Sequence, residues 1–242
     1  MNPAIDNREQ FHETVSQICG LYHSAKELAE SGVHLYSTDE KMGIQAKEHT
    51  RAKLNMEVGK PERIDPEYIR HGVTGIIASR DVVTGEIVKP MIQPTRTEKD
   101  FTAHVESVIS QHPQAKHIFI VDNLNTHMSE TLVRMVARID NIDETTLGIK
   151  RKCGILKNKQ TRAAFLADNC HRIVFFYTPK HCSWLNQIEC WFSIITRRLL
   201  NKRATFISVG DLENKIKSFV DYYNQFLKKP FLWNYKGKLL CA

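Results

Sequence analysis

The sequence lacks the features of a membrane-spanning or secreted protein. No apolar run approaches the roughly 20 residues needed to cross a bilayer. The opening residues, MNPAIDNREQF, contain no apolar stretch of a signal peptide. Internal repeats and low-complexity tracts are also missing. We therefore expect a cytoplasmic protein with no membrane partner, and its 42% hydrophobic and 25% charged content fits one large globular domain, with or without appendages.

Paired cysteines are missing as well. The six cysteines form no CxxC pair and have no regular spacing, which argues against a disulfide scaffold and favours free thiols. Cys170–His171 and His181–Cys182 each place two zinc-binding side chains next to one another. Neither has the ligand spacing of a zinc finger. The six are Cys19, Cys153, Cys170, Cys182, Cys190 and Cys241.

Positive charge is in excess. Lysine and arginine outnumber aspartate and glutamate by 34 to 27, a formal net charge of +7. Such a surplus favours a polyanionic partner such as nucleic acid, but many basic proteins bind none.

Hydrophobic periodicity predicts an α/β fold with a mixed sheet. The predicted order is a strand, a hairpin, and then helices alternating with strands, so that later strands join an initial meander through helical connections. An amphipathic helix comes first, to be packed on the domain or on another subunit. The predicted helices are 5–29, 98–111, 129–139, 184–200 and 212–227, with Ser129 as a possible N-cap, and the strands are 33–40, two within 73–94 joined at Thr84–Gly85, 117–123 and 171–179.

Two acidic residues end predicted buried strands, Asp39 and Asp122. One such aspartate is usually a turn or helix cap. Two at equivalent positions, the second followed by Asn123 and His127, favour a functional site, because the carboxyl ends of neighbouring strands meet at one rim of an open sheet. Glu40 is not expected to join them, since adjacent strand residues point to opposite faces.

Glu189 is the third acidic residue. It is predicted at the edge of the apolar stripe of helix 184–200, from where it can lean over the sheet rim. The tryptophans in this stripe are interpreted as core residues rather than as platforms for stacked bases. The stripe consists of Trp184, Ile188, Trp191, Ile195 and Leu199.

Three carboxylates at one rim would repel one another unless cations lie among them. Hard oxygen ligands suit Mg²⁺ or Mn²⁺ better than zinc. Two such ions about 4 Å apart activate a water or a 3′-hydroxyl in phosphodiester chemistry. Asp39, Asp122 and Glu189 are therefore candidate metal ligands.

Neighbouring polar residues have two interpretations each. His127 orients a water or contacts a phosphate, or it caps a helix start. Asn186 hydrogen-bonds the Glu189 carboxylate or a metal-bound water, or it caps its own helix. His181 and Ser183 meet DNA phosphate at the helix N-terminus, or only mark where the helix begins.

Candidate DNA contacts occur in two further places. Arg197 and Arg198 follow Glu189 on its helix and either contact the DNA backbone or interact with the helix dipole. The segment 149–162 is strongly basic, and it is either a solvated surface loop or a phosphate-contacting insertion. Its candidate contacts are Lys150, Arg151, Lys152, Lys157 and Lys159.

Three segments together resemble a known family. STDEK (37–41), VDNLNTH (121–127) and YTPKHCSWLNQIECWFSIITRRLL (177–200) are similar to the three acidic motifs of DDE transposases, in the branch of bacterial insertion sequences related to mariner elements. Segments 69–88 and 219–238 are also similar, so the resemblance covers nearly the whole chain. It implies a ribonuclease-H-like fold in which Asp39, Asp122 and Glu189 hold divalent ions.

The same resemblance implies a reaction and partners. Members cleave the DNA at transposon ends and join the freed 3′-hydroxyl to target DNA, with duplication of a TA dinucleotide. They work as dimers or larger assemblies on double-stranded DNA. For this chain the implied cofactor is Mg²⁺ or Mn²⁺, with two ions per site, and the implied location is the bacterial cytoplasm, on the nucleoid when bound to DNA.

The chain departs from the family pattern in two places. The segment between Asp122 and Glu189 is longer than usual and contains an insertion at about 140–168. Residues 1–32 leave room for one helical arm where members carry a helix-turn-helix reader, so we expect a catalytic domain over 33–242 and a reader on a separate partner or in a missing N-terminal region. Two other hypotheses stay open: a nonspecific nuclease of the same fold, and a DNA-binding or regulatory remnant without turnover.

Overall fold

The computed structural model describes residues 8–51, 56–61, 67–201 and 203–235. Part of the predicted first helix (5–7), the last residues of segment 219–238, and Cys241 lie outside these ranges.

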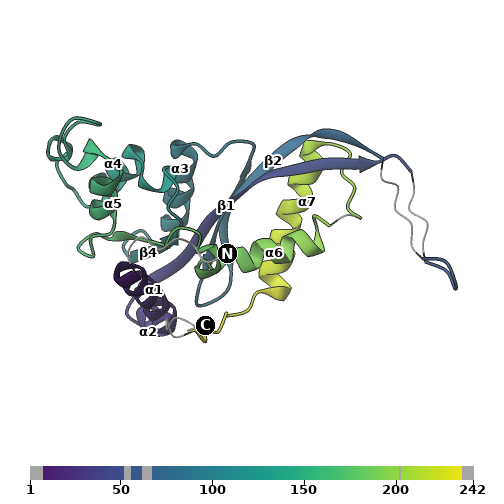
Figure 1. The fold of residues 1–242 in the computed structure, drawn as a ribbon, viewed down its shortest axis with the longest axis horizontal. Helices are drawn as coiled ribbons and strands as arrows, with labels where there is room; N and C mark the ends of the chain where they lie inside the picture. Colours follow the sequence, from purple (N-terminus) through teal and green to yellow (C-terminus); the bar gives the residue numbers. More distant parts are fainter. Residues whose placement is uncertain (1–7, 52–55, 62–66, 202, 236–242) are drawn as a thin grey trace.

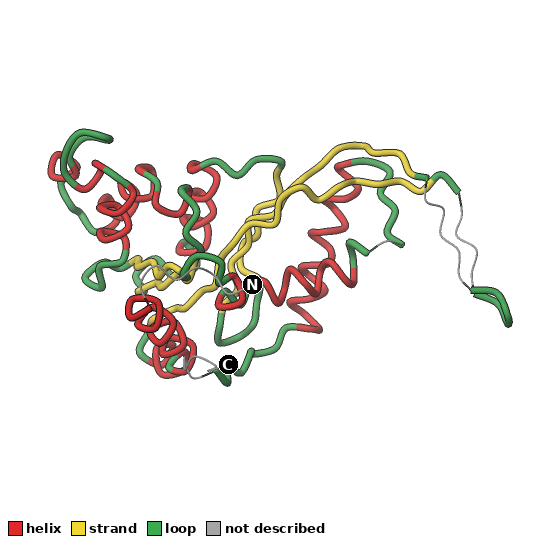
Figure 2. The backbone as a smooth tube through the Cα atoms, viewed as in Figure 1, coloured by secondary structure: helices red, strands yellow, loops and turns green. Residues whose placement is uncertain are grey.

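A five-stranded mixed sheet forms the centre of the fold (Figures 1 and 2). The strand order is β3-β2-β1-β4-β5. The first three strands form an antiparallel meander, and β4 and β5 add to β1 in parallel. The strands are β1 (Val33–His49), β2 (Tyr68–Asp81), β3 (Ile87–Gln93), β4 (Lys116–Val121) and β5 (Ile173–Tyr177). The predicted α/β fold with a mixed sheet is confirmed.

Helices cover both faces of the sheet. One face carries α3, α4 and α5, and the other carries α1 beside β4 and β5 and α6 with α7 beside the meander. The Ser129 side chain accepts a hydrogen bond from the Leu132 amide, so the predicted N-cap of α4 is confirmed. The helices are α1 (Arg8–His23), α2 (Ala25–Glu30), α3 (Glu98–Ile109), α4 (Glu130–Ile139), α5 (Lys159–Leu166), α6 (Ile188–Arg198) and α7 (Val209–Tyr222).

Strand alternation divides the core into two layers. Along β1, Leu35 packs with the α1 layer and Tyr36 with the α3 and α4 layer. Along β4, Ile118 and Ile120 join the first layer while Phe119 joins the second. Successive strand side chains point to opposite faces, so both faces are apolar and both need a helical cover.

The first predicted helix is two helices, α1 and α2, separated at Ser24. The Ser24 hydroxyl donates to the Gly20 carbonyl, which competes with the regular helical bond at that point. Val15, Ile18 and Tyr22 are buried against the sheet. Of the two predicted packing partners, this helix therefore uses the sheet of its own chain.

Strand β1 is longer than predicted and continues past Glu40 to His49. With β2 it forms a two-stranded arm beyond the other strands, flanked by α7 (Figure 2). The pairing shifts between Lys41 and Ile44, where Gly43 has φ 71°. Glycine tolerates this left-handed conformation, and the resulting bulge redirects the strand just after Asp39 and Lys41.

The insertion between Asp122 and Glu189 is folded. Short 3₁₀ turns and α5 bury Leu147, Leu156 and Leu166 completely in the core next to α4 and β5. Their burial removes apolar surface from water and fixes the segment. The interpretation of 149–162 as only a solvated loop is therefore wrong, although most of its basic side chains do lie at the surface.

Helix α6 begins at Ile188, four residues later than predicted. Ser183–Leu185 is a 3₁₀ turn instead. Trp184 is 50% exposed and its ring contacts Tyr235, so its assignment to the core is wrong. Trp191 is completely buried, as predicted. No helix within the described ranges has the length and apolarity to span a membrane.

Candidate active site

Asp39 lies on β1, and Asp122 directly follows the neighbouring strand β4. The parallel pairing of β1 with β4 runs to Ser37 opposite Ile120, two residues before each aspartate. Strand β4 ends at Val121, so Asp122 leaves the sheet beside the middle of β1, where Asp39 lies. The two carboxylates are close enough that the charge of Asp122 raises the pKa of Asp39.

Asp39 is largely buried, with 9% of its surface exposed. Its Oδ1 accepts from the Glu40 amide at 2.8 Å, and its Oδ2 accepts from Asn186 Nδ2 at 3.2 Å. Burial, followed by repulsion from Asp122, raises the pKa of Asp39 to about 7. A cation beside these two carboxylates would remove the cause of that repulsion.

Asn186 does not contact Glu189 in the predicted way; it joins its own turn to β1. Its Nδ2 also donates to the Thr38 carbonyl at 3.0 Å, and its Oδ1 accepts from the Ser37 hydroxyl. Ser37 Oγ in turn accepts from the Ile188 amide at 2.8 Å. Because α6 begins with no side-chain cap from its own N-cap residue, this strand serine supplies the missing acceptor. The alternative that Asn186 caps the helix is not observed.

Tyr22 of α1 supports the same turn. Its hydroxyl donates to the Leu185 carbonyl at 2.7 Å and accepts from the Gln187 amide at 3.3 Å. Sequence reasoning missed Tyr22 and Ser37. Tyr22 is on the buried face of an amphipathic helix, where a tyrosine gives no sign of a polar role, and Ser37 was visible only as the first residue of STDEK.

Asp122 is the more accessible aspartate, with 40% of its side chain exposed. Its Oδ1 accepts from the Leu124 amide at 2.9 Å and from His127 Nδ1 at 2.8 Å. Burial raises the pKa of Asp122, but the hydrogen bond and charge of His127 outweigh it, and the pKa is lowered. Asp122 therefore loses its proton at a lower pH than Asp39 does.

His127 is a buried partner of two carboxylates, and its predicted phosphate contact is wrong. Its side chain is fully buried, so it cannot touch a phosphate, and its ring lies between Asp122 and Glu40. The second contact joins Nε2 to Glu40 Oε1 at 3.1 Å, and the Glu40 side chain is 1% exposed. Burial lowers the pKa of His127, but the bonds to Asp122 and Glu40 prevail and raise it to about 10. A histidine facing two carboxylates must carry both ring protons to donate to each.

Glu189 enters from α6, in its first turn. Burial raises the pKa of its carboxyl group, Lys41 opposes this, and the charge of Asp122 adds to the rise. Glu189 therefore lies within electrostatic range of Asp122 and Lys41, and it lines one pocket with Lys41. Within the described parts of the chain, no three His, Cys, Asp or Glu side chains are already grouped closely enough to enclose a metal ion.

The donor chemistry of these residues nevertheless fits a hard divalent ion. All three carboxylates offer oxygen, and burial together with the charge of Asp122 raises the pKa of Asp39 and Glu189. The three-ligand centre remains a prediction.

The basic insertion reaches the site through Lys159. Its Nζ donates to the Asn123 carbonyl, and its charge helps to lower the pKa of Asp122. Asn123 itself donates from Nδ2 to the Thr178 carbonyl, which fixes the loop after β4 to the end of β5. Asn123 thus supports the loop that carries Asp122.

The other candidate DNA contacts lie at the surface. Lys150 pairs with Glu130 at 3.3 Å. His181 has φ 62° and leads into the 3₁₀ turn that starts at Ser183, not into a long helix, so the predicted phosphate contact at a helix N-terminus loses its geometric basis there. The remaining residues are exposed without an ion pair among the described side chains: Arg151, Lys152, Lys157, Arg197 and Arg198.

Comparisons with known proteins place this arrangement in a family. The sequence profile described as DDE superfamily endonuclease, DDE_3, matches residues 34–213, so the chain belongs to this family of endonucleases. A search of curated protein sequences gives no significant match.

Three solved structures share the fold. The Mos1 mariner paired end complex with Mn aligns with a TM-score of 0.53 and 13% identity over 91% of this chain and 59% of that one. The Mos1 transposase paired-end complex with left transposon end gives 0.52 and 16%, over 96% and 59%. The Mos1 transposase catalytic domain with Raltegravir and Mg gives 0.50 and 10%, over 95% and 89%.

At these identities the likeness shows the fold alone, which is the ribonuclease-H-like fold of a transposase catalytic domain. The chain spans 59% of the Mos1 chains in the two paired-end complexes but 89% of the separate catalytic domain.

Proposed function

We propose that this chain is the catalytic domain of a DDE transposase from the bacterial insertion-sequence branch related to mariner elements. In this proposal it cleaves DNA at transposon ends and joins the 3′-hydroxyl to target DNA at TA sites. The main observation behind this proposal is that Asp39 on β1 lies beside Asp122, which directly follows the neighbouring β4. Asn186 and Ser37 also bond the helix of Glu189 to the strand of Asp39. Family membership supports the endonuclease chemistry.

In this proposal Asp39, Asp122 and Glu189 hold Mg²⁺ or Mn²⁺, with two ions per site. Such ions lower the pKa of an attacking water or hydroxyl and stabilise the leaving oxygen. The protein fixes the ligands: His127 holds the Asp122 carboxylate, Asn186 holds Asp39, and the buried face of α6 holds Glu189. The Mos1 structures with Mn and with Mg support the choice of metal.

The partners also belong to the proposal. We place double-stranded DNA on the basic residues Lys150, Arg151, Lys152, Lys157, Lys159, Arg197 and Arg198, and a dimer or larger assembly on that DNA. The helix-turn-helix reader would be a separate partner or a further N-terminal region. Residues 33–242 form the catalytic domain, 1–32 its helical arm, and the protein acts in the cytoplasm. The Mos1 paired-end complexes support DNA end binding.

Asp122→Asn tests the catalytic assignment. The substitution keeps the shape and leaves an oxygen that accepts from His127, but it removes the ligand charge. We expect metal-dependent cleavage of element-end DNA to be lost in a protein that is still folded at the assay temperature, although its melting temperature falls because buried His127 loses the charge of one of its two carboxylate partners. Asp143→Asn is the control, because this exposed aspartate caps a turn in the insertion away from the site. Full cleavage by Asp122→Asn would refute the assignment.

A further inference from the structure

A cavity of about 970 Å³ adjoins Glu189, between α6 and the chain that follows α7. We call it the Arg80 pocket. Its charged lining consists of Lys41, Arg80, Glu189, Arg197 and Lys229, four cations and one carboxylate. Such a ratio within one cavity favours an anionic occupant.

Arg80 is the unusual member of this lining. It is 4% exposed, and its Nε is buried without a hydrogen-bond partner. Its Nη2 donates to the Lys229 carbonyl at 3.0 Å, and its guanidinium lies over the Phe231 ring at 5.8 Å. Among the described side chains it has no carboxylate partner. A buried guanidinium normally has a charged partner, because its desolvation is otherwise uncompensated.

The walls around Arg80 are fixed. Gly85, in the β2–β3 turn with φ 76°, lies so close to Lys229 that a Cβ there would be 2.1 Å from the Lys229 carbonyl oxygen. The same carbonyl accepts from Arg80, so the turn and the strand together hold segment 229–231 over the cavity. The pocket is therefore built into the fold.

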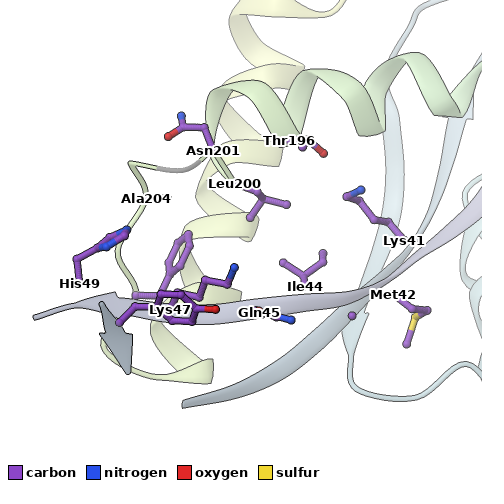
Figure 3. Close-up of a pocket in the computed structure, with 13 residues that line it drawn as sticks. Lys41, Met42, Ile44, Gln45, Lys47, His49, Thr196, Leu200, Asn201 and Ala204 are labelled. Carbon is purple, nitrogen blue, oxygen red and sulfur yellow. The ribbon is translucent and has the colours of Figure 1, made fainter. Parts of the chain in front are cut away.

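Further basic side chains lie along β1 beside the Arg80 pocket. Lys41 extends from β1 toward α6 and also lines a second cavity of about 560 Å³, whose wall includes Lys47 and His49 (Figure 3). A chain of phosphates leaving the Arg80 pocket would thus meet further basic side chains along the strand.

We propose that the Arg80 pocket binds a backbone phosphodiester of DNA next to the reacting phosphate. The Arg80 guanidinium donates to a phosphate oxygen from the N–H groups that the Lys229 carbonyl does not occupy, and its charge pairs with the phosphate. Lys41 and Arg197 neutralise the remaining charge at the rim. The position next to Glu189 rests on the proposed function, whereas the presence of a phosphate site does not.

Cysteine protection tests the proposal without any substitution. Cys190 is exposed and lines the pocket, and Cys170 is an exposed control that precedes β5 at the opposite rim of the sheet. We expect a linear DNA duplex with 3′ single-stranded ends, added in EDTA, to slow N-ethylmaleimide labelling of Cys190 about tenfold and to leave Cys170 unchanged. Unslowed labelling of Cys190 at saturating DNA would overturn the proposal, as would the absence of DNA binding.

Arg80→Met then tests the ligand itself, by fluorescence anisotropy with the same duplex over a range of salt concentrations. Loss of one phosphate contact should weaken binding about tenfold and reduce the slope of log Kd against log salt by about one. Arg138→Met removes an exposed arginine on α4 and should leave the slope unchanged. If Arg80 only anchors Lys229, the melting temperature falls but the slope keeps its wild-type value, and the proposal fails.

If Arg80→Met does not fold, the double variant Lys41→Met with Arg197→Met replaces it. This variant must also reduce the salt slope, and an unchanged slope overturns the proposed phosphate site.

Two outcomes of these experiments distinguish the phosphate site from the proposed function. If Arg80→Met reduces the slope of log Kd against log salt but the wild-type protein never cleaves DNA, the phosphate site is supported and the transposase assignment is rejected. If the protein cleaves DNA but Arg80→Met has the wild-type salt slope, the transposase assignment is supported and the phosphate site is rejected.

Discussion

Replacing Glu40 by glutamine should destabilise the protein although Glu40 is no candidate metal ligand. Glutamine keeps the shape of the side chain and an oxygen that accepts from His127 Nε2, but it removes the negative charge. His127 would then remain buried with Asp122 as its single charged partner. The substitution therefore measures how much the negative charge of Glu40 contributes to its buried contact with His127.

The size of the effect follows from the geometry. Two unit charges 3.1 Å apart interact by about 5 kcal/mol at an effective dielectric constant near 20. The rise in the pKa of His127 from 6.5 to about 10 is the net of burial, which lowers it, and of the two carboxylates, which raise it, and it corresponds to about 5 kcal/mol. Because Asp122 supplies part of this and glutamine keeps the hydrogen bond, we expect a loss of about 3 kcal/mol in the free energy of unfolding, near the range for breaking a buried pair.

The stability difference between Glu40→Gln and wild type should depend on pH. The folded pKa of His127 lies above the unfolded one, so the stabilisation is complete below about pH 6.5 and is lost as the pH rises through about 10. Urea unfolding in EDTA should therefore show a larger difference between Glu40→Gln and wild type at pH 7 than at pH 10. Glu48→Gln is the matched control, because Glu48 on the same strand contacts His71 at 2.7 Å but is partly exposed. Equal stability of Glu40→Gln and wild type at pH 7, or a difference that does not shrink at high pH, would refute the reasoning.

Three further predictions concern the supports of the site. Asn186→Leu should lower the free energy of unfolding in urea by about 3 kcal/mol, since the Ser37 hydroxyl and the Thr38 carbonyl lose a buried partner; an unchanged midpoint would contradict this. Leu156→Ala should cost about 2–5 kcal/mol in the same assay, because this side chain is completely buried, whereas a solvated loop would lose almost nothing. Burial lowers the pKa of His104 to about 4, so wild-type stability should fall from about pH 6.5 toward pH 4 as the unfolded state gains a proton first, and His104→Gln should flatten that fall.

Hydrophobic periodicity predicted the sheet and most helices, because the spacing of the buried apolar side chains is different in strands and in helices. The apolar run at 117–123 became β4, and the helical spacing from Phe101 to Ile109 became α3. The expectation that Asp39 and Asp122 lie near each other rested on the geometry of neighbouring strands, and the register of β1 with β4 brings them together. These features depend on local pattern and general sheet geometry.

Other features depend on contacts between distant segments, which no local pattern contains. Helix α6 begins at Ile188 because Ser37 and Tyr22 hold the preceding turn in place. Glu40 faces away from Asp39, as strand alternation predicts, yet it acts on the site from the other side through His127. Strand alternation shows which face a side chain is on, but it does not show that Glu40 contacts His127 from a distant segment.

The segment SWLNQIE shows how one short sequence can fix a carboxylate. Leu185 is buried and its carbonyl accepts from Tyr22, while Asn186 bonds to the strand of Asp39. Ile188 buries its side chain and gives its amide to Ser37. These bonds join α6 directly to β1, so the distance between Glu189 and Asp39 depends on buried hydrogen bonds and packing rather than on the irregular segment 179–183. The charge of Asp122 acts against that of Glu189, and this rigid connection keeps the helix in place against their repulsion.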